Sequence, residues 1–181
     1  ISAVGEVSDI RQTISPALEP VVGSKLIYID FSKDTFTLGG SSFAQVVNQM
    51  GTETPTIKDD AYFVKAFEAV QQLIKQNQIL SGHDISSGGL ITTLLEMCFP
   101  IPDVGLSVST KDLGNDLIKI FFSENPGIII QVEELGEVEK ILKREEVSYK
   151  IIGEVNSTRQ LSIDNYQLSI EPFRDKWFHT S

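Results

Sequence analysis

The segment from Gln78 to Cys98 constrains the fold of this chain more than any other. It begins with the short run Gln78-Ile79-Leu80, which predicts the start of a buried strand. Residues 83–89 then contain a histidine, an aspartate, two serines and two glycines, and an apolar helical pattern follows as far as Cys98. A strand that ends at polar residues and glycines and leads into a helix is where α/β proteins place ligands. The segment therefore predicts a ligand site at this corner.

The residues of the corner suit a phosphate and a metal ion. Two adjacent glycines, Gly88 and Gly89, let the backbone approach a ligand closely or adopt a positive φ. Free N–H groups at the start of a helix favour an anion, usually phosphate. The carboxylate of Asp84 beside such a loop can hold Mg²⁺. The alternative is that Asp84 and Ser86 only cap the helix, and one short motif taken alone slightly favours that interpretation.

A second corner of the same chemistry lies earlier in the chain. Leu38-Gly39-Gly40-Ser41-Ser42 precedes a helix predicted over residues 43–50. A turn with a helix cap explains this corner by itself, but two such corners in one domain favour a shared anion site. Glu124, close to Gly127, is interpreted as a turn carboxylate and His83 as a buried, hydrogen-bonded histidine, although both also suit a ligand site.

The composition predicts a globular domain and excludes several partners. The chain has 181 residues, of which 41% are hydrophobic, so it can bury a core. Its net charge of −10 argues against nonspecific binding to nucleic acid or to an anionic membrane. The apolar runs are only a few residues long, so no segment is expected to span a membrane. The single cysteine, Cys98, is expected to be a buried thiol in a reducing cytoplasm. Both ends look cut, as in a domain excised from a longer polypeptide.

The periodicity of apolar residues predicts a layered α/β or α+β domain with a mixed sheet covered by helices. Parallel pairs are expected where helices intervene between strands. The predicted strands cover residues 1–7, 25–31, 78–80 onwards, 104–109, 128–132, 149–155, 160–163 and 166–170. The predicted helices cover residues 43–50, 59–77, 90–98, 113–122, 134–145 and a last one from Pro172, and the helix at 59–77 is expected to bury Phe63, Ala66, Phe67, Val70, Leu73 and Ile74.

Several chemistries are disfavoured by what the sequence contains. The only histidines are His83 and His179, which with one cysteine argues against a zinc site. A serine–histidine–aspartate triad has no Gly-x-Ser-x-Gly segment to support it. The sequence also has neither a Walker phosphate loop nor a Gly-x-Gly-x-x-Gly fingerprint.

The corner motif has a family resemblance. Gly82-His83-Asp84-Ile85-Ser86-Ser87-Gly88-Gly89-Leu90 resembles the His-Asp-x-Ser-Asp-Gly-Gly-Leu motif in the C-terminal domain of the aminoimidazole-ribonucleotide-synthetase-like superfamily. Residues 38–42, 122–127 and 152–155 are similar to segments that occur in the same order in that domain. The resemblance covers nearly all of residues 1–181, which it identifies as a single domain of this type. Superfamily members include a purine-pathway cyclase, thiamine-phosphate kinase and selenophosphate synthetase.

The two ends of the chain narrow the resemblance. Residues 1–13 are similar to the entry of this domain in the large-form phosphoribosylformylglycinamidine synthases, and residues 173–181 resemble the segment leading towards their glutaminase domain. The chain therefore resembles the second such domain of those enzymes, with residues 172–181 expected to begin the linker. The family's nucleotide-binding and glutaminase domains are the partners that this implies.

The resemblance implies a role in purine biosynthesis. The family converts formylglycinamide ribonucleotide, ATP and glutamine to formylglycinamidine ribonucleotide, ADP, phosphate and glutamate, with Mg²⁺ bridging phosphates. The resemblance implies that Asp84 is a Mg²⁺ ligand and that Ser86, Gly88 and Gly89 form the part of the corner that faces the nucleotide. It implies no catalytic residue in this chain, and the fragment alone is expected to be inactive. Ser87 replaces the second aspartate of the motif. The alternatives are a module that holds an auxiliary ADP without chemistry, or a fragment of a superfamily kinase or cyclase.

Overall fold

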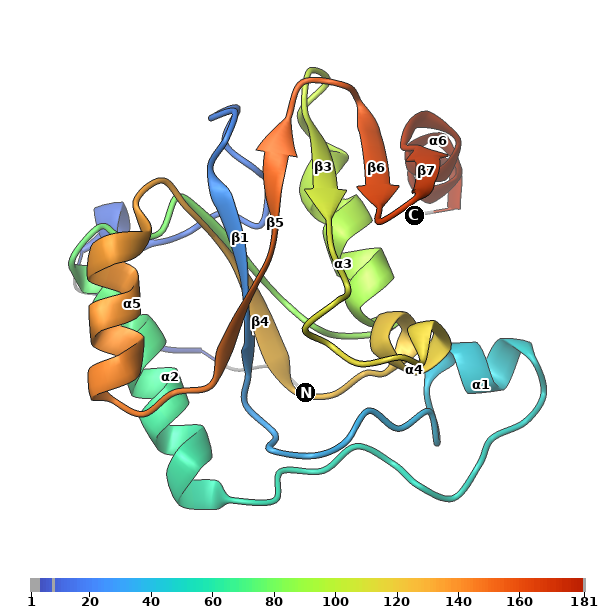
Figure 1. Cartoon of the computed structure of the whole chain (residues 1–181), viewed down its shortest axis with the longest axis horizontal. Helices are drawn as coiled ribbons and strands as arrows, with labels where there is room; N and C mark the ends of the chain where they lie inside the picture. The colour runs from blue at the N-terminus through green and yellow to red at the C-terminus, as the bar shows by residue number, and fades with distance from the viewer. Residues whose placement is uncertain (1–3, 8, 181) are drawn as a thin grey trace.

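A computed structural model describes residues 4–7 and 9–180. In this part of the chain, seven strands form one sheet in the order β2-β4-β1-β5-β3-β6-β7 (Figure 1). The strands are β1 (Lys25–Asp30), β2 (Ser81–Asp84), β3 (Gly105–Val108), β4 (Gly127–Val132), β5 (Tyr149–Asn156), β6 (Gln160–Ile163) and β7 (Tyr166–Ser169). The helices are α1 (Ser42–Val46), α2 (Asp60–Lys75), α3 (Gly89–Cys98), α4 (Leu117–Phe122), α5 (Leu135–Arg144) and α6 (Glu171–Thr180), with a 3₁₀ turn at Ile10–Gln12.

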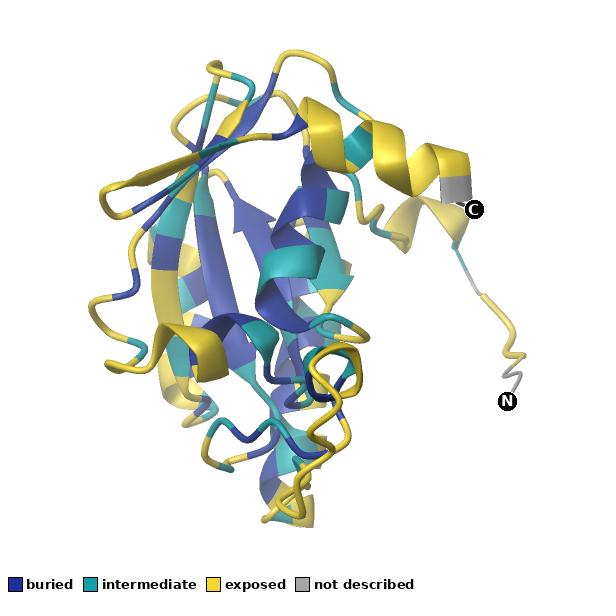
Figure 2. Cartoon of the chain, turned by 90° about the vertical axis from the view of Figure 1, so that its right-hand side faces the viewer, coloured by how far each residue is buried: buried dark blue, intermediate teal, exposed yellow. Residues whose placement is uncertain are grey.

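The sheet separates two hydrophobic cores. Successive side chains of a strand point to opposite faces, so Leu26 and Tyr28 of β1 pack with α3 and α4, whereas Ile27 and Ile29 pack with α2 and α5. In Figure 2 the buried residues lie in the strands and on the inner sides of the helices. None of the described helices is both long and apolar enough to cross a bilayer. The layered α/β class with a mixed sheet is therefore confirmed.

The expected parallel pairing is mostly wrong, because β3 and β6 are the one parallel pair among the described strands. β1 and β2, which are joined through α2, run the same way but both pair with β4, which lies between them antiparallel to each. β4 and β5, joined through α5, are likewise separated by β1. Helices α2 and α5 thus connect strands of the same direction, with another strand inserted between the two partners. Helix α4 instead connects β3 and β4, which run in opposite directions.

Several element boundaries and faces also differ from expectation. β2 begins at Ser81, after the run that predicted its start. Helix α1 ends at Val46, because Asn48 adopts a left-handed conformation (φ 54°) three residues before Gly51. Of the expected strand at residues 1–7, residues 1–3 lie outside the described residues and 4–7 form no strand.

The buried stripe of α2 is rotated from the predicted one. Tyr62 and Ala69 are buried, whereas Phe67 is 47% exposed. Phe63 and Phe67 stack on each other at 6.4 Å, and Phe63 meets Phe31 edge-on. These phenylalanines therefore form an aromatic cluster at the margin of the core.

Helix α6 is attached to the C-terminal end of α3. The guanidinium of Arg159 donates to the carbonyls of Cys98 and Ile101 at 2.8 and 2.6 Å and pairs with Glu171 of α6 at 2.6 Å. The indole of Trp177 donates to Glu96 of α3 at 3.0 Å. Residues 171–180 thus form a helix on the domain surface, and their predicted continuation as a linker stays a prediction.

Candidate functional site

The predicted corner lies at one end of the sheet, together with several other loops. Asp84 at the end of β2 pairs with Ile128, and Asp30 at the end of β1 pairs with Gly127, so both aspartates flank the start of β4. The loops that follow β1 and β2 and the loop that precedes β4 therefore meet at this end (Figure 1). Strand pairing places the two glycine–serine corners and Glu124 in the same neighbourhood.

The two corners are in direct contact. The hydroxyls of Ser42 and Ser87 are hydrogen-bonded at 2.6 Å, although 45 residues separate them in sequence. Phe43, which follows the first corner, stacks on Phe122 at 4.7 Å. The two corners therefore lie together, while the shared anion site expected at them stays a prediction.

Glu124 occupies the position where an external anion was expected. Its Oε1 accepts hydrogen bonds from the backbone N–H of Ser42 and of Gly88, both at 2.8 Å. The N–H of Gly89 donates to the carbonyl of Ser86 at 3.0 Å. The expectation of free amides at Gly88 and Gly89 is therefore wrong, because the chain supplies its own carboxylate and carbonyl to them. Sequence reasoning interpreted Glu124 as a turn residue and missed that it joins both corners.

Both glycines of the second corner are required by space as well as by conformation. Gly88 and Gly89 have φ values of +90° and +72°, which residues with a side chain rarely adopt. A Cβ on Gly89 would lie 2.7 Å from the carbonyl oxygens of Phe121 and Ser123, and one on Gly88 would overlap Thr92. The backbone of the corner is therefore packed directly against α4 and the first turn of α3.

Asp84 and Ser86 do not cap helix α3. The N-cap residue is Gly88, and no side chain bonds to the first amides of the helix. The side chain of Asp84 is 78% exposed, and Ser86 is also exposed. The capping interpretation is wrong, and both polar groups face the solvent beside the helix start.

His83 is held inside the corner, as expected. Its side chain is 15% exposed, with Nδ1 lying 2.8 Å from the carbonyl of Asp84 and Nε2 3.3 Å from Glu96. The carbonyl of Asp84 also accepts the hydroxyl of Thr93 at 3.3 Å. These bonds fix the backbone from which the Asp84 carboxylate extends.

The described residues contain no group of three or more histidine, cysteine, aspartate or glutamate side chains placed to hold a metal ion. Among the described residues, Asp84 therefore belongs to no such group. Cys98 is buried, and burial raises the pKa of its thiol to about 12, so it is the inert structural thiol that the sequence predicts.

Comparison with known families agrees with this architecture. Residues 21–164 match the family model described as AIR synthase related protein, C-terminal domain. The chain belongs to this family. The AIR synthase related domain is 34% identical over 191 aligned residues to a probable phosphoribosylformylglycinamidine synthase, chloroplastic/mitochondrial, of Arabidopsis thaliana, a match that covers all of this chain and 13% of the relative. It is 37% identical to the Homo sapiens phosphoribosylformylglycinamidine synthase, over 80% of this chain and 11% of that protein.

Solved structures share the fold of this AIR synthase related domain. PurL of Thermotoga maritima complexed with FGAR has a TM-score of 0.66 at 11% identity, over 90% of this chain and 29% of that one. The same protein complexed with ATP has a TM-score of 0.64 at 10% identity, over 88% of this chain and 27% of that one. At these identities the likeness shows the fold. The chain spans only a small part of the length of each relative.

Proposed function

We propose that this domain is part of an ATP- and glutamine-dependent ligase that converts formylglycinamide ribonucleotide to formylglycinamidine ribonucleotide, and that it contributes to a Mg–nucleotide site. The similarity to two phosphoribosylformylglycinamidine synthases supports the reaction. The exposed carboxylate of Asp84, beside the exposed hydroxyl of Ser86 at the start of α3, is the observation that carries the site.

The residues present fit a magnesium ion that is shared with a nucleotide. Mg²⁺ is usually held by one or two carboxylates together with phosphate oxygens and water, and Asp84 supplies one such carboxylate. In this proposal Asp84 holds the ion, and Ser86, Gly88 and Gly89 form the surface that faces the nucleotide. When bound, the ion neutralises phosphate charge during phosphoryl transfer.

In this proposal the residues of the corner hold the Mg–nucleotide site in place and take no part in the chemical step themselves. Glu124 and the Ser42–Ser87 pair hold the corner rigid, and the bonds of His83 orient the backbone at Asp84. The glutaminase step that releases ammonia, and most nucleotide contacts, would belong to neighbouring domains of the full-length ligase. The buried free thiol of Cys98 suits a reducing compartment such as the cytoplasm.

A second candidate is that the corner holds an auxiliary ADP without taking part in chemistry. The amides of Gly88 and Gly89 are already bonded within the chain, so they offer little to phosphate groups in either role, and the observation that favours the auxiliary role is the missing second carboxylate of the motif. Ser87, which stands where the motif usually has a second aspartate, is bonded to Ser42 and leaves Asp84 as a single carboxylate. In this alternative the domain contributes to stability and assembly.

Calorimetric titration of Mg-ADP and Mg-ATP into the nucleotide-free, full-length ligase tests the proposal. We expect Asp84→Asn to weaken Mg–nucleotide binding by about tenfold or more, as the loss of residues around a metal typically does. Asp103→Asn is the matched control, because Asp103 is an exposed aspartate in a turn away from the corner. Loss of turnover together with binding supports the catalytic role, and lost binding with retained turnover supports the auxiliary site. Unchanged binding in Asp84→Asn would contradict both.

A further inference from the structure

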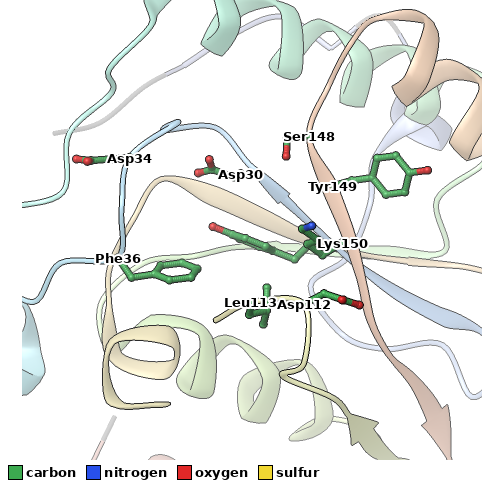
Figure 3. A pocket seen from close by; sticks show the side chains of 9 residues that line it. Asp30, Asp34, Phe36, Asp112, Leu113, Ser148, Tyr149 and Lys150 are labelled. Atoms are coloured by element: carbon green, nitrogen blue, oxygen red, sulfur yellow. The ribbon is translucent and has the colours of Figure 1, made fainter. Parts of the chain in front are cut away.

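A cavity of about 150 Å³ opens where β1 ends and β5 begins. Its walls come from these two strands and from the loops of residues 31–37 and 109–116. Figure 3 shows Asp30 and Ser148 on one side of it and Asp112 and Leu113 on the other. We call it the Tyr28 cavity, after the tyrosine of β1 that lines it. At about 30 Å³ for each water, its volume corresponds to roughly five water molecules, so it can take a ligand of about that many heavy atoms.

The side chain of Tyr28 is buried, yet no described residue bonds to its hydroxyl. Tyr28 is 5% exposed, and the one described side-chain polar atom that is fully enclosed without a partner is Oγ1 of Thr37. The unpaired oxygen of Tyr28 is therefore open to the cavity that its side chain lines. Burial, and then the nearby charge of Asp30, raise the pKa of this phenol, so it stays neutral. A buried hydroxyl left unbonded costs free energy, so a group inside the cavity should satisfy it.

Tyr62 shows the contrast, since it is equally buried at 5% exposure. Its hydroxyl donates to the carbonyl of Asp30 and accepts the N–H of Ser148, both at 3.0 Å. This phenol is a structural bridge between the end of β1 and the start of β5. Of these two tyrosines, which lie on opposite faces of the sheet, only the one in the cavity is left without a bond to the rest of the fold.

Two carboxylates of the cavity have no cationic partner. Asp30 accepts the backbone N–H groups of Ser32 and Lys33, both at 2.9 Å, and the hydroxyl of Ser32 at 2.6 Å. All three donors are neutral, and Asp30 forms no ion pair with another described residue. Asp112, on the opposite wall, forms none either. Both negative charges are therefore available to a ligand in the cavity.

The other two charges of the lining do not reverse this balance. Asp34 lies 3.5 Å from the ammonium of Lys58, which compensates it. Lys150 is the one cationic residue of the lining and has no ion pair among the described residues. It lies opposite Tyr28 on the neighbouring strand and is exposed, so water screens its charge. Two uncompensated carboxylates against one exposed ammonium leave the cavity negative, which selects a cation.

The walls of the cavity suit an organic cation better than a bare metal ion. Three aspartates line it, but the described residues contain no group of three acidic, histidine or cysteine side chains placed to hold a metal. The ring of Phe36 lies 6.3 Å from that of Tyr28, and Leu113 lies on the wall beside Asp112 (Figure 3). Aromatic faces attract ammonium groups, and apolar walls favour the carbon chain attached to them. A cation with a short apolar chain therefore matches this lining.

We propose that the Tyr28 cavity binds a small primary amine in its ammonium form, with an apolar chain of about four carbons to match the volume of the cavity. The ammonium donates to the oxygen of Tyr28 and lies between the carboxylates of Asp30 and Asp112. The chain lies against the ring of Phe36. The inference goes beyond the proposed function, because no residue of the proposed Mg–nucleotide site lines this cavity.

Titration of n-butylammonium chloride into the full-length ligase, without nucleotide or Mg²⁺, tests the proposal when binding is followed by saturation-transfer NMR. The neutral n-butanol is the control ligand and should bind about tenfold more weakly, because it lacks the charge. We expect Tyr28→Phe, which removes one hydrogen bond to a charged group, to weaken n-butylammonium binding about tenfold. It should leave the melting temperature of the free protein unchanged, because the hydroxyl has no partner among the described residues. The control Tyr62→Phe should lower the melting temperature and leave binding unchanged.

Charge variants test the sign of the ligand. Asp112→Asn should weaken n-butylammonium binding about 2- to 5-fold and Lys150→Gln should strengthen it by about the same factor, because both residues are exposed. The exposed Asp103→Asn is the matched control and should change nothing. Weaker binding in Lys150→Gln would overturn the proposal, as would equal affinity of the wild type and Tyr28→Phe, which would leave ordered water only in the cavity. These outcomes are separable from failure of the proposed function, which would appear as absent ATP-dependent turnover in the wild-type ligase.

Discussion

Glu124 is the residue on which the geometry of the corner most depends. One carboxylate oxygen accepts two backbone N–H groups, from loops that lie 82 and 36 residues away in the chain. A carboxylate accepting from backbone N–H groups makes charge-assisted bonds, which are stronger than neutral ones. Without it, two amides at this end of the sheet would lose their partner.

We expect Glu124→Ala to lower the free energy of unfolding by about 2–3 kcal/mol, because both amides lose a charged acceptor. Glu124→Gln keeps an acceptor oxygen and should cost about 1 kcal/mol. Urea denaturation measures both. The exposed Glu133→Ala provides the control and should stay within about 0.5 kcal/mol of the wild type. Equal losses for the alanine and glutamine variants would show that the two bonds contribute little.

At this scale the sequence predicted the groups of the site but not their partners. The exposed Asp84 and the positive φ of Gly88 follow from a polar, glycine-containing corner, and the buried Cys98 follows from its apolar helix. The contact of Glu124 with Ser42 depends on the strand order, which brings β1 and β2 to either side of β4. No local pattern encodes that order.

Among the elements, the turn between β6 and β7 shows how one side chain joins three strands. Asp164 has a left-handed backbone (φ 49°), and its carboxylate accepts the hydroxyl and the N–H of Thr110 at 2.6 and 3.2 Å. Thr110 follows β3, so the carboxylate fixes the hairpin of β6 and β7 to its parallel neighbour. These hydrogen bonds hold the pKa of Asp164 below its usual value of 3.8.

A depressed carboxylate pKa stabilises the folded state above the unfolded pKa, and this contribution is lost as pH falls through the folded pKa. We therefore expect Asp164→Asn, which tolerates the left-handed backbone, to lower stability near pH 7 by about 1 kcal/mol. The difference from the wild type should shrink below pH 3.8, where the unfolded wild-type carboxyl protonates. Urea denaturation from pH 7 to pH 2.5 checks this, and a constant difference across that range would contradict it.

Helix α2 shows why element faces are harder to predict than element existence. The apolar period correctly indicates a helix, which was expected over residues 59–77 and covers Asp60–Lys75 with Asp59 as its N-cap. Apolar residues occur on more than one side of it, so periodicity favoured Phe67 over Ala69. The small Ala66 and Ala69 are buried in the core that α2 shares with β1, β4 and α5, and the larger rings are placed at its margin.

For the whole molecule, the central fact is that one sheet serves two cores. β1 contributes Leu26 to one core and Ile27 to the other, and both are fully buried. A substitution that loosens the packing on either face of the sheet therefore destabilises the same strand, β1. The layered class could be predicted from the alternation of strands and helices, whereas the mostly antiparallel pairing could not, because a helix between two strands fixes neither their adjacency nor, at α4, a common direction.

We expect Leu26→Ala and Ile27→Ala each to lower the free energy of unfolding by about 2–5 kcal/mol, as is usual for buried aliphatic truncations. Each variant should unfold in a single transition when followed by both far-ultraviolet circular dichroism and calorimetry. Exposed Val64→Ala on α2 serves as the control, with a change below about 1 kcal/mol. Two separate transitions in either variant would mean that the cores are independent units.

The attachment of α6 has an optical consequence. Trp177 is the only tryptophan of the chain, and its indole donates to Glu96, whose second oxygen lies 3.3 Å from His83, the neighbour of Asp84. Indole emission responds to the hydrogen bonding and polarity around the ring. The domain therefore carries an intrinsic fluorophore two side chains away from its proposed metal ligand, and events at the corner can be followed in it without an added dye.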